Sequence, residues 1–363
     1  MRISVWRVSS VWGLFLAATF FVSASGRGEP IPPPAFELEQ RRSDPDRPAR
    51  THGDPYGGPI IDTHVHFLSP KSGNPHNAEP KEVLEAIKSS GVELAIVMPT
   101  PNEGRRLNHE EGVRLRRKLV ELGGKRIKRF CSSNYLTYWM HRVYREGYSE
   151  EELQQVLQRL SEALASGGCA GVGEVAIYHF MKRPRQKVLE YPPNFEPFLR
   201  MVQLVAEGGV WLDLHAEPVD PHGKSYLAQV FGGIELLFRR NSSLKLILSH
   251  TAMTNPINVR RMLHAYPRLM LNIKVVSKHY RWRNLEPIVN PERQLYEDWA
   301  ELFEEMPQRF MIGTDGKFGR QRWAVTKYSK RIQQMRVILG SLEPKAAKMI
   351  AYGNARRKFE SSK

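Results

Sequence analysis

Three polar side chains alternate within a short apolar segment near the start of the chain, PIIDTHVHF at 59–67. In a β-strand successive side chains point to opposite faces, so Asp62, His64 and His66 are expected to share one face. Two neighbouring imidazoles can bind a metal ion, but a strand with one solvated polar face would show the same pattern. The segment alone therefore leaves both interpretations open.

Other residues of metal-ligand type follow at or near the ends of later apolar segments. They are Glu174 in CAGVGEVAI, His215 in GVWLDLHAEP, His250 in LKLILSHT and Asp315 in RFMIGTDG. Imidazole and carboxylate ligands together suit Zn, Mn, Fe or Co, whereas Ca takes oxygen ligands only. Asp62 has two possible roles, which are to fix a histidine tautomer or to hydrogen-bond the backbone at the start of its strand.

Eight apolar, β-branched segments recur along the chain, and they start at residues 59, 92, 126, 169, 209, 244, 269 and 309. Helical patterns lie between them, as at 79–91, 149–168 and 194–209, and these three end in glycine. This alternation predicts an α/β fold of the (β/α)8 TIM-barrel type, with a doubly wound open sheet as the alternative. In a barrel the C-terminal ends of the strands meet at one mouth, so the candidate ligands should converge there.

The N-terminus predicts export. Arg2 and Arg7 accompany an apolar run at 11–22, and small residues follow, which is the order of a signal peptide. We expect residues 1–24 to be removed, leaving no stable membrane span and a periplasmic or secreted protein; an uncleaved anchor is the alternative, although the run is short for a span. Residues 25–58, rich in Pro and Arg, are predicted to form a flexible tether or a tail draped over the surface, and 59–363 the barrel domain.

The chain is strongly basic, with a formal net charge of +16. Such a charge concentrates anions around a protein without identifying them. The basic residues occur in scattered short groups, which argues against nucleic acid as a partner because nucleic-acid arms carry one dense block. The sequence gives no indication of the oligomeric state.

Two cysteines, Cys131 and Cys169, fall on successive predicted strands. They are too few for a disulfide scaffold, and they lack the spacing of a metal site. We expect two buried free thiols, with a single bridge in an oxidising compartment as the alternative.

The motifs, taken together and in order, resemble the amidohydrolase superfamily of metal-dependent hydrolases, above all its amidohydrolase-related and TatD-like branches. The resemblance extends over the chain from Pro59 onward and includes the closing AYGNARRKF. It implies one or two divalent metal ions, zinc before Mn, Fe or Co. The ligands that it implies are His64, His66, Glu174, His215, His250 and Asp315.

The resemblance also implies how these residues divide the work. His64 and His66 would share the more buried ion with Asp315, and the later histidines would bind a second ion. Glu174 would bridge the two, or would be a paired carboxylate if only one ion is present, in which case His250 would act as an acid or orient the substrate. A metal lowers the pKa of bound water from 15.7 toward about 7, and Asp315 would accept the proton that the water gives up.

Basic residues in the loops after the last two strands predict the substrate. Arg281, Arg283 and Lys317 lie there, and Arg suits carboxylate or phosphate, although solvated surface cations would look the same. The leading hypothesis is an exported metal-dependent hydrolase that cleaves an ester, lactone, amide or phosphoester bond of an anionic small substrate. The alternatives are a mononuclear decarboxylase of the amidohydrolase-related group and a TatD-like nuclease or nucleic-acid-binding protein.

Overall fold

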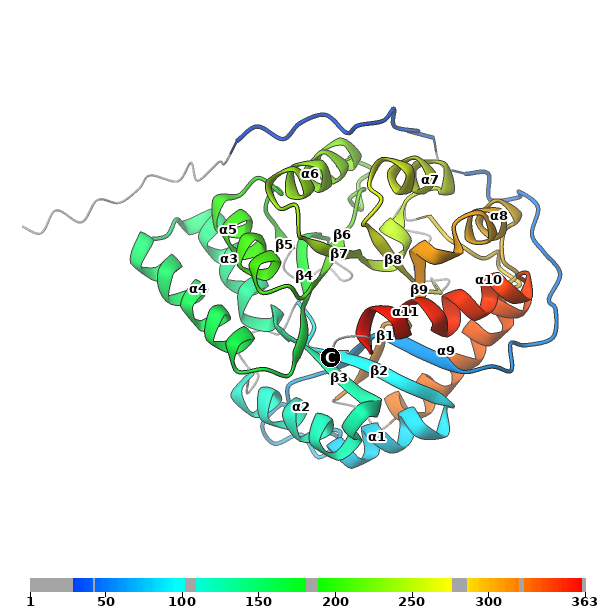
Figure 1. Cartoon of the computed structure of the whole chain (residues 1–363), viewed down its shortest axis with the longest axis horizontal. Coiled ribbons are helices and arrows are strands. Elements are labelled where there is room, and N and C mark those ends of the chain that lie inside the picture. The colour runs from blue at the N-terminus through cyan, green and yellow to red at the C-terminus, as the bar shows by residue number, and fades with distance from the viewer. Residues whose placement is uncertain are drawn as a thin grey trace, which may run out of the picture.

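A closed barrel of parallel strands, surrounded by helices, forms the body of the protein (Figure 1). The computed structural model describes residues 29–41, 43–101, 109–180, 189–275, 286–319 and 323–360. The barrel strands are β1 (Ile60–Phe67), β2 (Val92–Met98), β3 (Ile127–Ser132), β4 (Cys169–His179), β6 (Trp211–Ala216), β7 (Lys245–Leu248), β8 (Met270–Ile273) and β9 (Phe310–Ile312). The barrel closes where Asp62 of β1 lies opposite Ile312 of β9. The predicted TIM barrel is confirmed, and all eight predicted segments supply its strands.

Two further strands lie near the mouth of the barrel and were not predicted. The strand β5 (Leu189–Glu190) runs antiparallel to β4, and β10 (Gly316–Phe318) runs parallel to β1. Each has only two or three residues, which is too short to show a periodic pattern in the sequence.

The helices follow the strands in the order that the sequence predicted. They are α1 (Pro80–Ser89), α2 (His109–Gly123), α3 (Ser133–Glu146), α4 (Glu150–Ala165), α5 (Glu196–Glu207), α6 (Leu227–Arg240), α7 (Pro256–Ala265), α8 (Glu297–Glu305), α9 (Trp323–Gly340), α10 (Pro344–Lys348) and α11 (Asn354–Phe359), with short 3-10 or π turns η1 (Gly124–Arg126), η2 (Ser249–Met253), η4 (Pro307–Arg309) and η5 (Met349–Gly353). The helical patterns at 79–91, 149–168 and 194–209 correspond to α1, α4 and α5. Local sequence explains their starts: at α4, for example, the Ser149 side chain accepts a hydrogen bond from the Glu152 amide.

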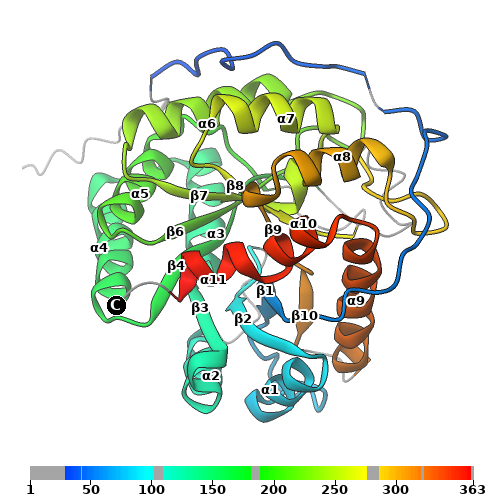
Figure 2. The same ribbon diagram turned by 45° about the vertical axis from the view of Figure 1, so that its right-hand side comes forward.

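Apolar side chains fill two regions, one between the strands and the helices and one inside the N-terminal end of the barrel. The helix α11 lies across that end (Figures 1 and 2) and contributes Ala355 and Phe359 to the inner cluster. The other buried members of this inner cluster are Ile61, Leu94, Ile96, Met98, Phe130, Trp211, Ile247, Met270 and Met311. One end of the barrel is therefore closed by apolar packing.

The described part of the N-terminal segment, 29–41 and 43–58, lies over the surface of the barrel, which was one of the two predictions for it. It runs along the outside of the barrel past α6, α7 and α8 to α9 (Figure 1), and we call it the N-terminal belt. The Asn258 side chain donates to the Glu39 carbonyl at 2.8 Å, and the Tyr56 amide donates to the Arg336 carbonyl at 2.9 Å. The predicted signal peptide, 1–24, lies outside the described residues.

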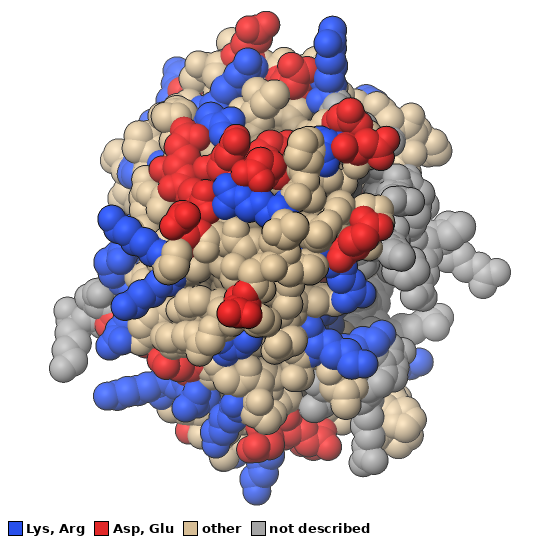
Figure 3. Space-filling view, turned by 90° about the vertical axis from the view of Figure 1, so that its right-hand side faces the viewer, with Lys and Arg blue, Asp and Glu red and all other residues tan. Residues whose placement is uncertain are grey.

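The side of the molecule that carries the end of the belt shows mixed charge (Figure 3). Arg50 of the belt, for example, forms ion pairs with Glu297 and Glu304 of α8. The net charge of +16 is therefore not concentrated into a uniform positive field on this face. Within the described residues, no helix is both long and apolar enough to cross a bilayer.

The two cysteines form a disulfide between β3 and β4. The expectation of free thiols at Cys131 and Cys169 was therefore wrong. The strands are parallel neighbours, which brings the two Cα atoms to 5.9 Å, a separation that a disulfide readily bridges.

Candidate metal centre

The six candidate ligands meet in one buried cluster at the mouth of the barrel, as the strand-end rule predicts. They come from β1, β4, β6, η2 and the turn after β9, and they are His64, His66, Glu174, His215, His250 and Asp315. The Nε2 atoms of His64 and His66 lie 3.3 Å apart, and His66 Nε2 lies 3.0 Å from Asp315 Oδ1. Residues up to 251 positions apart in the sequence thus place their polar atoms within contact of one another.

The Glu174 carboxylate lies at the centre of the cluster, between two pairs of histidines. Its Oε2 atom is 3.8 Å from His64 Nε2 and 3.4 Å from His66 Nε2. Its Oε1 atom is 2.7 Å from His215 Nδ1 and 3.4 Å from His250 Nε2. Each carboxylate oxygen therefore faces a different pair of imidazoles.

The geometry of the first histidine pair fits a divalent metal ion. Two nitrogen ligands at 2.0–2.1 Å from a tetrahedral ion lie about 3.4 Å apart, close to the separation of the two Nε2 atoms. Ligand histidines also tend to hydrogen-bond through their second ring nitrogen. His64 does so through Nδ1, 3.1 Å from Asp213 Oδ2, and His66 does so through Nδ1, 3.1 Å from the Pro99 carbonyl oxygen.

The two carboxylates of the cluster are held in the ionised form. Burial alone raises the pKa of Glu174, but the His215 and other histidine rings outweigh it and hold this pKa well below its usual range. Burial likewise raises the pKa of Asp315, but the ammonium groups of Lys274 and Lys317 bring it well below the usual range. Both side chains are therefore available as anionic ligands.

The ring of His250 is held neutral, which is the form that binds a metal. Burial in the cluster and the nearby Lys274 ammonium lower the pKa of His250 well below its ordinary value. A neutral imidazole keeps a lone pair on one ring nitrogen. His250 is therefore suited either to bind an ion or to accept a proton.

The backbone adopts left-handed conformations at two of the candidate ligands. His250 has φ 62° and begins a run of four such residues to Met253, and Asp315 has φ 51°. For residues other than glycine these conformations cost about 1–3 kcal/mol each and are found mainly at functional sites. Hydrogen bonds hold them in place: the His250 amide donates to Asn272 Oδ1 at 2.8 Å, and the Asp315 amide donates to the His64 carbonyl at 3.0 Å.

Asp62 does not line the cluster, contrary to the prediction that it shares a face with the two histidines. The register of β1 against β2 is irregular between Asp62 and Val65, so the strict alternation is broken there. Asp62 accepts hydrogen bonds from the His64 and Thr314 amides and from the Tyr328 hydroxyl of α9. Of the two roles considered for Asp62, hydrogen bonding to the backbone is the one observed. The side chain stabilises the strand and does not fix the tautomer of a histidine ring.

Three residues at the site were missed from the sequence. Asp213 contacts His64, Glu217 Oε1 lies 3.3 Å from His215 Nε2, and Lys274 Nζ lies 2.5 Å from Asp315 Oδ2. Asp213 and Glu217 flank His215 at alternate positions in DLHAE, which is the pattern that drew attention to β1. The same rule applied to β6 would have found them.

Of the predicted substrate-binding residues, one is described. Lys317 Nζ lies 3.3 Å from Asp315 Oδ1, and its side chain is 41% exposed. With the buried Lys274 it places two cations beside Asp315. Arg281 and Arg283 lie outside the described residues.

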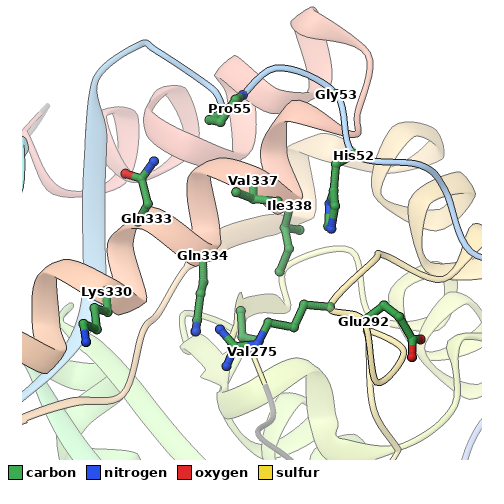
Figure 4. Close-up of a pocket in the computed structure, with 11 residues that line it drawn as sticks. His52, Gly53, Pro55, Val275, Glu292, Lys330, Gln333, Gln334, Val337 and Ile338 are labelled. Carbon is green, nitrogen blue, oxygen red and sulfur yellow. The ribbon is translucent and has the colours of Figure 1, made fainter.

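A cavity of about 650 Å³ lies between the N-terminal belt and α9 (Figure 4). Its walls include His52 and Pro55 of the belt, Gln334 and Ile338 of α9, and Val275, which follows Lys274 in the chain. None of the six candidate ligands, all of which are described, lines it. The cavity is therefore lined by other residues than the candidate ligands.

Comparisons with known proteins agree with this architecture. A family model described as Amidohydrolase matches residues 61–360. An uncharacterized TIM-barrel protein from Bordetella bronchiseptica has a TM-score of 0.51 and 12% identity, over 84% of this chain and 99% of that one. A probable 2-pyrone-4,6-dicarboxylic acid hydrolase from Acinetobacter baumannii has a TM-score of 0.47 and 14% identity, over 83% and 99%. At 12% identity the Bordetella structure shows a shared fold alone. No curated protein matches the chain.

Proposed function

Because the chain belongs to the amidohydrolase family of metal-dependent hydrolases, we propose that it hydrolyses an ester, lactone, amide or phosphoester bond of an anionic small molecule. For this reaction it would hold two divalent metal ions, with zinc as the first choice. The observation that carries the two-ion proposal is the placement of Glu174. One of its oxygens faces His64 and His66 and the other faces His215 and His250, as a bridging ligand would. Mixed imidazole and carboxylate donors suit zinc among the common ions.

The ions would supply Lewis acidity and lower the pKa of a bound water from 15.7 toward about 7. Asp315 would accept the proton of the attacking water and pass it to the leaving group. Lys274 stabilises the carboxylate form of Asp315 that this step needs, since its ammonium lies 2.5 Å from Oδ2. The left-handed backbone at Asp315, held by the amide bond to His64, fixes the direction in which the carboxylate points.

The anionic substrate is proposed from the cations near the mouth. Lys317 is partly exposed beside Asp315, so its side chain can turn toward a substrate carboxylate or phosphate, and Arg281 and Arg283 follow β8 in the sequence. We expect Lys317→Ala to raise the KM for an anionic substrate about tenfold and to leave a neutral analogue of the same bond nearly unchanged. Equal effects on both substrates would contradict this assignment.

Export is proposed on two grounds. The N-terminal order of basic, apolar and small residues is typical of a signal peptide, and the Cys131–Cys169 bridge is of a kind that persists in oxidising compartments. Mass spectrometry of the protein from its native cells would test both, by locating the mature N-terminus and by alkylating any free thiols. An N-terminus at Met1 with two alkylated cysteines would overturn the proposal.

The decisive experiment is the metal content of protein purified without chelator, measured by plasma mass spectrometry for the parent and for Glu174→Ala. Two ions per chain falling to one in the variant would support the bridged site. One ion in both would contradict it and would favour the mononuclear decarboxylase alternative. A parent protein without bound metal, even after incubation with Zn²⁺, Mn²⁺ or Co²⁺, would overturn both.

A further inference from the structure

We propose that β6 controls the two metal sites separately, because Asp213 sets which nitrogen His64 presents to the cluster and Glu217 sets which nitrogen His215 presents. The inference rests on the proposed two-ion function. A neutral imidazole has one N–H and one lone pair, so an acceptor on one side places the lone pair on the other. A carboxylate behind a ligand histidine is thus a positioning residue for the metal.

Asp213 is placed to do this for His64. It is fully buried, and its Oδ2 atom lies 3.1 Å from His64 Nδ1. The Ser249 hydroxyl donates to Oδ1 at 2.5 Å, and the side-chain amide of Asn272 donates to Oδ2 at 3.3 Å, so the carboxylate is fixed on both sides. With its proton on Nδ1, His64 presents the Nε2 lone pair to the cluster.

Glu217 is placed to do the same for His215, with the opposite result. It is 2% exposed, and its Oε1 atom lies 3.3 Å from His215 Nε2 and 2.9 Å from His179 Nδ1. Its Oε2 atom accepts a hydrogen bond from the Phe180 amide at 3.0 Å. In the structure the Nδ1 atom of His215 lies 2.7 Å from Glu174 Oε1 and donates its proton there. When an ion takes the place of that proton, the proton on Nε2 would stay with Glu217, and Nδ1 would present its lone pair to the cluster.

The two carboxylates thus act on different histidine pairs although they lie four residues apart on one strand. His64 belongs to the pair that faces Glu174 Oε2, and His215 belongs to the pair that faces Glu174 Oε1. Because each carboxylate contacts the histidine of only one pair, a change at one carboxylate should be felt mainly at its own site. A general loss of packing in β6 would instead weaken both sites together.

The test is a Co²⁺ titration of the full chain against a competing chelator, followed by the cobalt absorption bands. Asp213→Asn and Glu217→Gln are matched carboxylate-to-amide changes, and each should weaken one binding step by about 10- to 100-fold while the other step stays within about threefold. The step that each affects is assigned in a His250→Ala background, which removes one of the two histidines that face Glu174 Oε1 and is expected to abolish the second site. There Glu217→Gln should add nothing, whereas Asp213→Asn should still weaken binding.

Several outcomes would overturn the inference. The first is that both variants weaken the same binding step, and the second is that neither variant weakens either binding step. The third is that the parent binds a third ion that Glu217→Gln removes, which would make His179, His215 and Glu217 a metal site of their own. If Glu217→Gln does not fold, His179→Phe replaces it, and this variant should weaken the second step by a smaller factor. If the parent binds two ions and both variants bind Co²⁺ as tightly as the parent, this inference alone is refuted. If the parent binds fewer than two ions, the proposed two-ion function is refuted with it.

Discussion

The two ends of the barrel are built from the same strands but have opposite chemistry. At the N-terminal end, apolar side chains such as Ile61, Trp211 and Met311 pack against Phe359 of α11. At the C-terminal end, a few residues further along the same strands, the interior holds buried histidines and carboxylates with left-handed backbone at His250. One end is arranged for stability, and the other carries polar burial and backbone strain that only a function would maintain.

This contrast indicates that stability and chemistry can be changed separately. Burial of Phe359 stabilises the fold in proportion to the apolar area removed from water. Burial of ionised groups such as Glu174 and Asp315 is unfavourable unless they are paired or bind metal. A substitution at the apolar end should therefore change unfolding, whereas one at the mouth should change activity.

Metal removal is the strongest test of the contrast. Dialysis against a chelator should lower kcat/KM by at least about 10⁴-fold, equivalent to ~5.5 kcal/mol, because no hydroxide is formed at neutral pH without the ions. Circular dichroism should show the barrel still folded, and added Zn²⁺ should restore activity. Chelated protein that unfolds at room temperature would contradict the separation of the two ends.

The apolar end should show the reverse behaviour. Phe359→Ala removes a large buried side chain and should lower the free energy of unfolding by about 3–5 kcal/mol. Urea denaturation measures this, and kcat/KM per folded molecule should stay within about twofold. Leu122→Ala on α2, where the side chain is 38% exposed, is the matched control and should change stability by less than about 1 kcal/mol.

The disulfide should act on stability without touching the metal site. It closes a loop with a sequence separation of 38, so replacing Cys131 and Cys169 together with Ala should cost about 2–4 kcal/mol of unfolding free energy. The metal content of the double variant should equal that of the parent. A lost ion in the double variant would show that β3 and β4 couple the two ends.

The smallest expected effect is the loss of unfolding free energy when the ion pair between Arg50 of the belt and Glu304 is removed, and this loss should depend on pH. Burial raises the pKa of Glu304, but hydrogen bonds from Arg50 outweigh it, so this pKa lies below its ordinary 4.5 in the folded protein. A carboxyl with a lowered folded pKa adds stability above its unfolded pKa, and that stability is lost as the pH falls through the folded value.

Arg50→Ala should therefore cost about 1 kcal/mol at neutral pH, measured by urea denaturation. The difference from the parent should shrink as the pH is lowered below 4.5. Lys81→Ala on the exposed face of α1 serves as a control with no expected pH-dependent difference. A gap between Arg50→Ala and the parent that widens in acid would show that the Glu304 pair is not the cause.

Most of the fold was predictable because long periodic segments indicate their structure directly. The barrel strands and helices such as α4 have clear apolar periods and local start signals such as Ser149. The strand β10 and the path of the belt were not predictable. Both depend on contacts with residues far away in the sequence, such as those between Tyr56 and Arg336.

The candidate site was found for a related reason. His215, His250 and Asp315 stand at strand ends, and in a barrel that position alone brings them together. Asp62 was misplaced because one irregularity in a strand shifts the faces of the residues around it. Lys274 was missed because a lone lysine in an apolar segment shows no pattern until its partner, Asp315, is known.

The belt also has a consequence for the order in which the chain can fold. Its hydrogen bonds reach Asn258 and Ser341, which lie 219 and 291 residues further along the chain. A chain is synthesised from its N-terminus, so the belt exists long before the helices to which it binds. Contacts of such long range form slowly because a large loop must close first. We therefore expect the first segment of the domain to be made to be among the last to reach its final place, after the barrel and its outer helices have formed.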